Sequence, residues 1–370
     1  MSVNFKKSLF WEQRQLEDAV EDYVVKTTIE NQYPILTSSQ QKGIILQEEY
    51  FSGERTSKSG NIGYFILPRG YFAYRSRSDN DTYVFNRNDC IDKGIISYFY
   101  PVFRPKNTDS NFLLRRLNTG MQRQLLIASE GTGQHVLSLK KFKNMKTNFP
   151  CIEEQQKVGE LFQSLDRTIT LHEEKQEQLE QLKKALLQKM FADKTGYPEI
   201  KFRGFDEPWD QQKFGAILTT HSFRQYLATP SNNGRYKVIQ QGEDPIIGYA
   251  DGVPFKDYKD VVLFGDHTVS LYKPTAPFFL ATDGVKILSS KELTGQYLFA
   301  ALERYKPNSQ GYKRHYSILK DTRMSFTKNR EEQKKIGNVF YVIDQILSLH
   351  QSKLDYLKEL KQALLQQMFI

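Results

Sequence analysis

Two stretches of this chain, each of about 40 residues, repeat one another. Residues 153–192 read EEQQKVGELFQSLDRTITLHEEKQEQLEQLKKALLQKMFA, and residues 331–370 read EEQKKIGNVFYVIDQILSLHQSKLDYLKELKQALLQQMFI. Roughly 19 of the aligned positions are identical without a gap, and a repeat of this length reflects the architecture of the chain. Each copy follows a block of globular-looking sequence, so the order of block, helix, block, helix predicts a pseudo-dimer within one polypeptide.

The composition suits two ordinary domains joined by helices, because the chain has 370 residues, of which 39% are hydrophobic and 13% aromatic. No apolar run is long enough for a membrane helix, and the N-terminus lacks the apolar stretch of a signal peptide. Cys90 and Cys151 lack metal-ligand spacing. We therefore expect a cytoplasmic protein with free thiols and no membrane association. The net charge of +9 permits binding to a polyanion without establishing it.

The globular blocks have the composition of mixed domains, with short β-like runs separated by Gly, Asn, Asp and Ser. We expect strands near 43–46, 64–67, 71–74 and 94–100, then near 236–239, 245–249, 261–264 and 278–280, with a helix at 293–305. Trp11 and Trp209 begin related segments, whereas the middles of the blocks do not match. The predicted class is α/β (α+β), with domains at 1–150 and 209–328, long helices at 151–192 and 329–370, and a linker at 193–208.

The long helices show apolar steps that alternate mostly between four and three residues, the seam of a coiled coil. The seam of the first helix contains Val158, Phe162, Leu165, Ile169, His172, Leu179, Leu182 and Leu186. The seam of the second contains Ile336, Phe340, Ile343, Leu347, His350, Leu354, Leu357, Leu360 and Leu364. Around Leu182 and Leu360 a step of three replaces one of four, which predicts a heptad slip.

Two such seams in one chain predict an antiparallel pair, although each helix could instead pack on its own block. The histidines on the seam, His172 and His350, are expected to fix register rather than to bind a metal or catalyse a reaction. Gly159 and Gly337 are unfavourable inside a helix and predict a close crossing of helices or a bend.

No catalytic constellation is present in the sequence. It has no phosphate-binding G-x-x-x-x-G-K-[ST] loop and no N/D-P-P-Y/F tetrapeptide, and its histidines lack metal-ligand spacing. His267 beside Asp266 has no Ser or Cys in a nucleophile setting. We therefore expect no catalytic residue, no metal site and no cofactor bound to this chain.

Basic clusters in both blocks are the candidates for DNA binding, since basic groups suit phosphates and guanine edges. Taken singly, each of these residues is more typical of a solvated surface. The candidates in the first block are Arg69, Arg75, Arg77, Gln134, His135, Lys140 and Lys141. The candidates in the second block are Arg224, Arg235, Lys237, Lys256, Lys313, Arg314 and His315.

Several motifs match a known family over essentially the whole chain. They are the EEQ-x-K-[VI]-G opening and L-x-x-L-K-x-ALLQ-x-MF close of both helices, the PEIKFRGFDEPW linker, TSSQQKGIILQEEYF, VVLFGDHTVSL and FLATDGVKIL. With these motifs the chain resembles the DNA specificity subunit of type I restriction–modification systems.

The resemblance implies that each block is a target recognition domain for one half of a bipartite site in double-stranded DNA. It also implies that the helices set the spacing and dock two modification (methyltransferase) subunits, which use S-adenosylmethionine to methylate adenine. Restriction subunits would add ATP- and Mg-dependent translocation and cleavage. The competing hypotheses are a self-contained nuclease or methyltransferase, and a coiled-coil protein–protein adaptor without DNA specificity.

Overall fold

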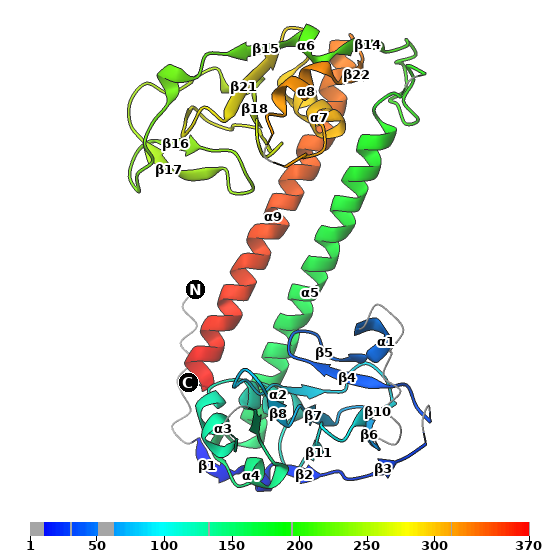
Figure 1. The fold of residues 1–370 in the computed structure, drawn as a ribbon, viewed down its shortest axis with the longest axis vertical. Coiled ribbons are helices and arrows are strands. Elements are labelled where there is room, and N and C mark those ends of the chain that lie inside the picture. The colour runs from blue at the N-terminus through cyan, green and yellow to red at the C-terminus, as the bar shows by residue number, and fades with distance from the viewer. Residues whose placement is uncertain are drawn as a thin grey trace. The chain divides into compact units, whose positions relative to one another are not determined.

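The computed structural model describes residues 11–29, 32–50, 63–131, 134–193, 195–311 and 313–369. The chain forms two compact units, one of residues 1–171 with 354–370 and one of residues 172–353. Each unit therefore contains a globular block and a segment of both long helices, so the contacts divide the chain differently from the five consecutive segments expected from the sequence. The long helices are α5 (Ile152–Lys189) and α9 (Arg330–Phe369) (Figure 1).

The first unit is built on two small sheets. The four-stranded antiparallel sheet has the order β2 (Val20–Asp22), β11 (Val102–Pro105), β7 (Phe72–Tyr74) and β9 (Phe85–Arg87). The three-stranded sheet has the order β10 (Lys93–Ser97), β6 (Tyr64–Pro68) and β3 (Lys26–Thr27). Three two-stranded ribbons pair β1 (Glu12–Gln15) with β13 (Lys146–Phe149), β4 (Leu36–Ser39) with β5 (Gly43–Leu46), and β8 (Arg77–Ser78) with β12 (His135–Val136). The short helices are η1 (Leu16–Asp18), α1 (Gln47–Tyr50), α2 (Ser110–Asn118), α3 (Gln122–Ala128) and α4 (Leu139–Lys143).

The second unit repeats the four-stranded sheet and the β1–β13 ribbon of the first, whereas its three-stranded sheet is mixed, with β16 and β20 parallel. Its four-stranded antiparallel sheet has the order β15 (Leu218–His221), β21 (Val285–Ser290), β18 (Val262–Gly265) and β19 (Leu271–Tyr272). Its three-stranded sheet has the order β17 (Ile246–Ala250), β16 (Tyr236–Ile239) and β20 (Phe278–Leu280), and its ribbon pairs β14 (Asp210–Lys213) with β22 (Arg323–Phe326). The remaining helices are α6 (Phe214–Ile217), η2 (Arg224–Tyr226), η3 (Tyr258–Asp260), α7 (Gly295–Tyr305) and α8 (Tyr316–Asp321).

The two four-stranded sheets have the same strand order along the chain and in space, although their sequences do not align. The strands β2, β7, β9 and β11 correspond to β15, β18, β19 and β21. In the same way, α2 corresponds to α7 and α4 to α8. The mixed α/β class expected from the sequence is confirmed, and the duplication extends into the sheets that the sequence comparison left unmatched.

A buried glutamine fixes each long helix to its own globular block. Gln155 accepts hydrogen bonds from Thr108 Oγ1 and the backbone N of Asp109, and its amide donates to Pro150 O. Its repeat counterpart Gln333 accepts from the backbone N of Thr294 and donates to Glu292 O and Thr327 O. The Gln of the EEQ motif therefore holds the N-terminal turn of α2 or α7 against the start of the long helix.

The duplicated tryptophans and glycines belong to the same joint. Trp11 Nε1 donates to Glu154 Oε1 at 3.1 Å, and Trp209 binds the equivalent carboxylate of Glu332, whose pKa is raised by burial. A Cβ on Gly159 would lie 2.4 Å from Asp109 Oδ1, and one on Gly337 would lie 2.8 Å from the backbone N of Tyr297. The close helix crossing expected at both glycines is therefore present.

The long helices also pack antiparallel to one another within each unit. In the first unit Leu165 and Ile169 form a buried cluster with Leu354 and Leu357. In the second unit His172 Nδ1 lies 2.9 Å from His350 Nδ1, and Gln176 donates to Gln351. The paired arrangement and the packing of each helix on its own block, which the sequence presented as alternatives, coexist.

The end of each long helix enters a globular core. Phe369 packs with Trp11, Phe112 and Phe162 in the first unit. Its counterpart Phe191 packs in the second unit among Trp209, Tyr297 and Phe340. The MF ending shared by both repeats is therefore a core anchor.

The predicted heptad slip is wrong. Leu182 is 49% exposed, and the seam position is occupied instead by Lys183, whose side chain is only 14% exposed. The Lys183 ammonium lies 2.7 Å from Glu303 and 2.6 Å from Asp344, so the aliphatic stem fills the seam while the charge is paired. Burial lowers the pKa of Lys183, but the two carboxylates outweigh it and the net shift is upward. In the first unit the counterpart Lys361 pairs with Asp166, and Leu360 and Lys361 are both half-buried.

Candidate nucleic-acid interface

A polar groove in the first unit brings together several of the predicted DNA-binding residues. We call it the first groove; its cavity of about 570 Å³ lies between the β4–β5 hairpin and the segment that contains β8. The tip of the hairpin contributes Gln40, Gln41 and Lys42, and the facing segment contributes Arg75 and Arg77. The other lining residues are mainly hydroxyl and amide side chains: Thr37, Ser38, Ser39, Tyr50, Ser78, Asp79, Asn80, Thr82, Val84, Asn86 and Tyr100.

Gln134 and His135 lie beside this groove because β12 pairs with β8. Gln134 Nε2 donates to Asp79 Oδ1 at 2.6 Å, and Arg75 binds the other oxygen of Asp79 at 3.2 Å. His135 Nδ1 lies 3.4 Å from Asp81 Oδ1. The structure thus gathers Arg75, Arg77, Gln134 and His135 from two distant segments.

The remaining candidates of the first block lie elsewhere. Arg69 binds Asp92 and the backbone carbonyls of Asp89 and Cys90, so its guanidinium holds a loop. Lys140 and Lys141 lie on α4, where Lys141 pairs with Glu130.

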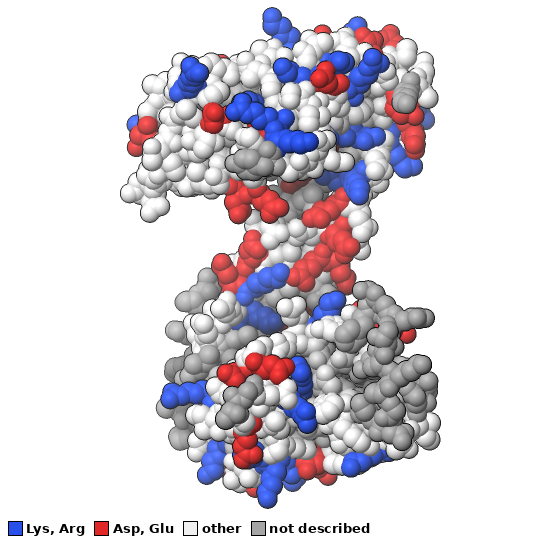
Figure 2. Space-filling view, in the orientation of Figure 1, with Lys and Arg blue, Asp and Glu red and all other residues white. Residues whose placement is uncertain are grey.

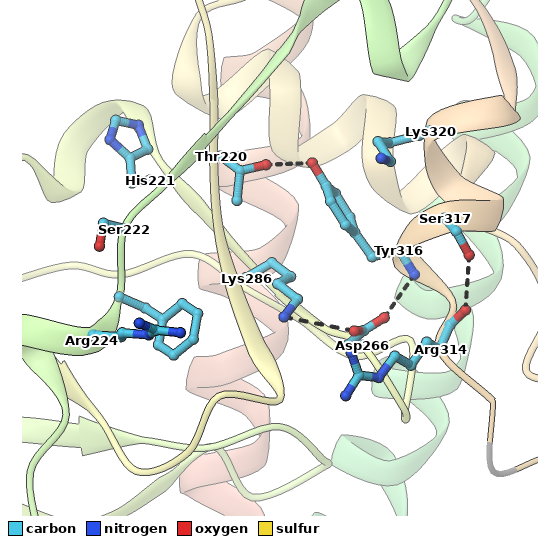
Figure 3. Close-up of a pocket in the computed structure, with 11 residues that line it drawn as sticks. Thr220, His221, Ser222, Arg224, Asp266, Lys286, Arg314, Tyr316, Ser317 and Lys320 are labelled. Carbon is cyan, nitrogen blue, oxygen red and sulfur yellow. Dashed lines mark hydrogen bonds and ion pairs between the residues drawn. The ribbon is translucent and has the colours of Figure 1, made fainter.

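The second unit contains a cavity of about 710 Å³ with a basic lining, which we call the second cavity (Figure 3). Its cationic side chains are Arg224 from η2, Lys286 from β21, and Arg314 and Lys320 at the two ends of the α8 segment. Its single carboxylate is Asp266, and its other lining residues are Thr220, His221, Ser222, Phe223, Tyr316 and Ser317. Of the predicted candidates, only Arg224 and Arg314 line this cavity.

The assignment of His315 to the DNA contacts is wrong, because its side chain is completely buried. Its backbone N donates to Asp266 O at 2.7 Å, and its Nε2 accepts from the backbone N of Gln310 at 2.9 Å. His315 therefore anchors the segment that carries Arg314 rather than facing a ligand.

Four further candidates of the second block do not line the second cavity. Arg235 pairs with Asp251 beside β16, and Lys237 lies within that strand. Lys256 follows the short bridge between Phe255 and Phe278, and Lys313 lies in the exposed turn after Gly311.

The basic and amide residues that only the fold places in the first groove and the second cavity were not identified from the sequence. The turn of the β4–β5 hairpin contains Gln40, Gln41 and Lys42. A polar turn between two apolar runs is the sequence signal that could have identified these residues. Lys286 alternates with buried residues along β21. Its position opposite Arg314 could not be read from the sequence, because these residues are far apart along the chain.

Charge is unevenly spread over the molecule. On the face in Figure 2, acidic side chains gather over the long helices, whereas basic side chains lie over both globular blocks. Among the described residues, no three His, Cys, Asp or Glu side chains are placed to hold a metal ion, and no helix is long and apolar enough to cross a membrane. Cys90 and Cys151 are both exposed free thiols.

Comparison with known proteins identifies a family for residues 11–181 and a fold for the whole chain. Residues 11–181 match the family of type I restriction modification DNA specificity domains. The chain is similar, at 15% identity and a TM-score of 0.70, to the S subunit of a type I restriction-modification system from M. genitalium, with 100% of this chain and 98% of that chain covered. It also matches the HsdS subunit from Thermoanaerobacter tengcongensis at 16% identity and a TM-score of 0.42, covering 99% and 98% of the two chains. A chain of a type I R-M complex matches at 17% identity and a TM-score of 0.47, covering 99% of each. Among curated proteins, none matches significantly.

Residues 11–181 therefore carry the DNA specificity domain of type I restriction–modification systems, and the chain as a whole shares the fold of the S subunit from M. genitalium. The family is that of DNA-recognition specificity subunits, which are not themselves catalytic.

Proposed function

We propose that each globular block of this chain reads one half of a split DNA site, while the long helices set the separation of the halves. The observation that carries this proposal is the duplicated frame with dissimilar contents. The strand order of the four-stranded sheet and the same Gln, Trp and Gly joints recur in both units, but the first groove and the second cavity share neither position nor lining. Two globular blocks with different binding surfaces on one duplicated frame suit a DNA site whose two halves differ.

The chemistry of the first groove suits direct reading of bases. A two-stranded β ribbon fits the major groove of B-DNA, where Gln pairs with adenine and Arg with guanine. The β4–β5 hairpin presents Gln40 and Gln41 at its tip, facing Arg75 and Arg77. We therefore assign base reading of the first half-site to this groove.

We propose that the long helices set the distance between the two half-sites. A helix of this length spans about 60 Å, more than the ~34 Å between half-sites one turn apart on B-DNA. Inserting a few residues into both helices should change the number of unread base pairs and leave the bases themselves unchanged. Exchanging residues ~20–145 for those of a relative should change one half-site only. Altered base identity in the insertion variant would contradict this division of labour.

Two copies of a modification subunit are the proposed partners of the helices. Leu171 on α5 and Leu349 on α9 are repeat counterparts, and they are 60% and 69% exposed. A large apolar side chain exposed at the same position of both repeats suits two identical docking sites. These subunits would bring S-adenosylmethionine and methylate adenine, and restriction subunits would bring ATP- and Mg-dependent translocation and cleavage, in the cytoplasm. The chain itself would need no cofactor.

The number of modification subunits bound to the chain can be measured. L171D and L349D should each reduce the number of bound modification subunits from two to one in native mass spectrometry, and the double variant should bind none. L182D, which alters an exposed leucine whose counterpart Leu360 is half-buried, is the matched control and should retain both. A double variant that still binds two subunits would rule out these positions.

A further inference from the structure

We propose that the second cavity is a phosphate-binding site particular to the second unit. Its ligand is a phosphate group, supplied either by the backbone of bound DNA or by a free phosphorylated molecule. The DNA source rests on the proposed function, whereas the free source does not. The residues that would bind it are Arg224, Lys286, Arg314 and Lys320.

The charge of the cavity favours a phosphate ligand. Four cationic side chains face one carboxylate, Asp266, which is itself buried and accepts a hydrogen bond from the backbone N of Tyr316. Lys286 lies 3.7 Å from Asp266 and donates to Asp283 O at 3.0 Å, and the third N–H of its ammonium can take a further partner. Figure 3 shows no interaction between the guanidinium of Arg224 or Arg314 and the other lining residues. Guanidinium groups bind phosphate in a bidentate geometry, and both are positioned to do so.

The walls of the cavity are fixed by hydrogen bonds. The backbone N of His315 donates to Asp266 O, and the backbone N of Tyr316 donates to Asp266 Oδ1. The buried His315 ring accepts from the backbone N of Gln310. The hydroxyl of Tyr316 reaches Thr220 across the cavity, and His221 Nε2 bonds Ser289 Oγ at 2.7 Å. The cations therefore stand on a framework that exists before any ligand arrives, which lowers the cost of binding.

In the described part of the first unit, the cavity beside the corresponding elements has no such cluster of cations. There, β2 and α4 take the positions of β15 and α8, and the cavity beside them is lined by Glu17, Asp18, Glu21 and Asp22 with only Lys106 and Lys143. Lys143 is already paired with Asp22 at 3.0 Å. The duplicated frame thus carries a basic cavity in one unit and an acidic one in the other, so the cations are not a requirement of the fold.

The test uses the full chain, with R224Q/R314Q as the probe variant and K106Q/K143Q as the frame-matched control. In one arm, binding of a random-sequence DNA duplex is measured against salt concentration. The probe variant should reduce the slope of log affinity against log salt by about one to two, since each lost phosphate contact removes about 0.9. In the other arm, inorganic pyrophosphate is titrated calorimetrically, and the probe variant should lose binding that the control retains.

A loss in the first arm identifies the DNA backbone as the source, and a loss in the second arm alone identifies a free phosphorylated ligand. If both variants behave as the wild type in both arms, the proposal is overturned. Circular dichroism melting checks that the probe variant folds, and R224K/R314K, which keeps the charge, should recover part of the binding. Failure here leaves the proposed function intact when the wild-type complex still methylates a split motif; absence of such a motif would instead count against the proposed function.

Discussion

Replacing Lys183 with methionine should destabilise the second unit far more than the same change at its repeat counterpart Lys361. Lys183 is the shared cation of Glu303 and Asp344, whose side chains are only 20% and 28% exposed. Removing it leaves two partly buried carboxylates without their partner, and such a loss costs about 3 kcal/mol. Burial already raises the pKa of Glu303, which shows how poorly the site solvates a negative charge.

The same substitution at the repeat counterpart, K361M, is the control for the loss of stability in K183M. Lys361 is 30% exposed, and its partner Asp166 also binds Arg115, so the carboxylate keeps a cation after the change. The expected cost is about 1 kcal/mol or less. For a unit of this size each kcal/mol lowers Tm by about 2–4 °C, so K183M should lower the transition of the second unit by roughly 6–12 °C.

The assay is hydrogen exchange on the full chain, which reports each unit separately where a single melting curve could not. Faster exchange in K183M should be confined to peptides of residues 172–353. Adding E303Q and D344N to K183M should restore most of the stability, since it removes the unpaired charges. Equal effects of K183M and K361M, or no rescue by the neutral partners, would refute the reasoning.

The other predictions concern the joints and the seam. Q333L should cost about 3 kcal/mol, because it strands the backbone N of Thr294 and two carbonyls, and chemical denaturation would contradict this if the loss were under about 1 kcal/mol. G337A should destabilise despite better helix propensity, since its Cβ would lie 2.8 Å from the backbone N of Tyr297; a raised Tm would disprove the close crossing. H172L/H350L should leave stability equal or higher, as apolar side chains replace a polar contact in the seam, and a large fall in Tm would assign the pair more than a register role. Burial lowers the pKa of Lys273 to about 8, below its unfolded value of about 10.4, so stability should rise with pH between these values relative to K273M; parallel pH profiles would contradict it.

Much of the frame could be predicted from the sequence because it is carried by local patterns. The runs at 43–46, 236–239 and 278–280 form β5, β16 and β20 with the expected bounds, and the repeats form α5 and α9. The spacing of apolar residues did not predict the seam where a charged side chain occupies a seam position. Lys183 displaces Leu182 because a long aliphatic stem can fill a seam position when its ammonium finds carboxylates on neighbouring elements.

The candidate site was harder to predict because it depends on contacts between distant segments. Basic residues in a sequence do not reveal which are paired: Arg69 is tied to Asp92, and His315 is buried beneath the segment it anchors. Arg75 and Arg77 were identified, yet Gln40 and Gln41 were not, because only the fold places the hairpin tip opposite them. The matching strand order of the two four-stranded sheets was also invisible, since pairing order is preserved while the side chains differ.

Single-molecule sequencing of adenine methylation in the host, with and without this gene, tests the central claim most directly. We expect that deletion of the gene abolishes methylation at one motif. This motif should have two different halves separated by unread bases, because the two globular blocks differ and the helices that join them perform no reaction. An unchanged methylation pattern, or methylation of DNA by the purified chain alone, would contradict the account.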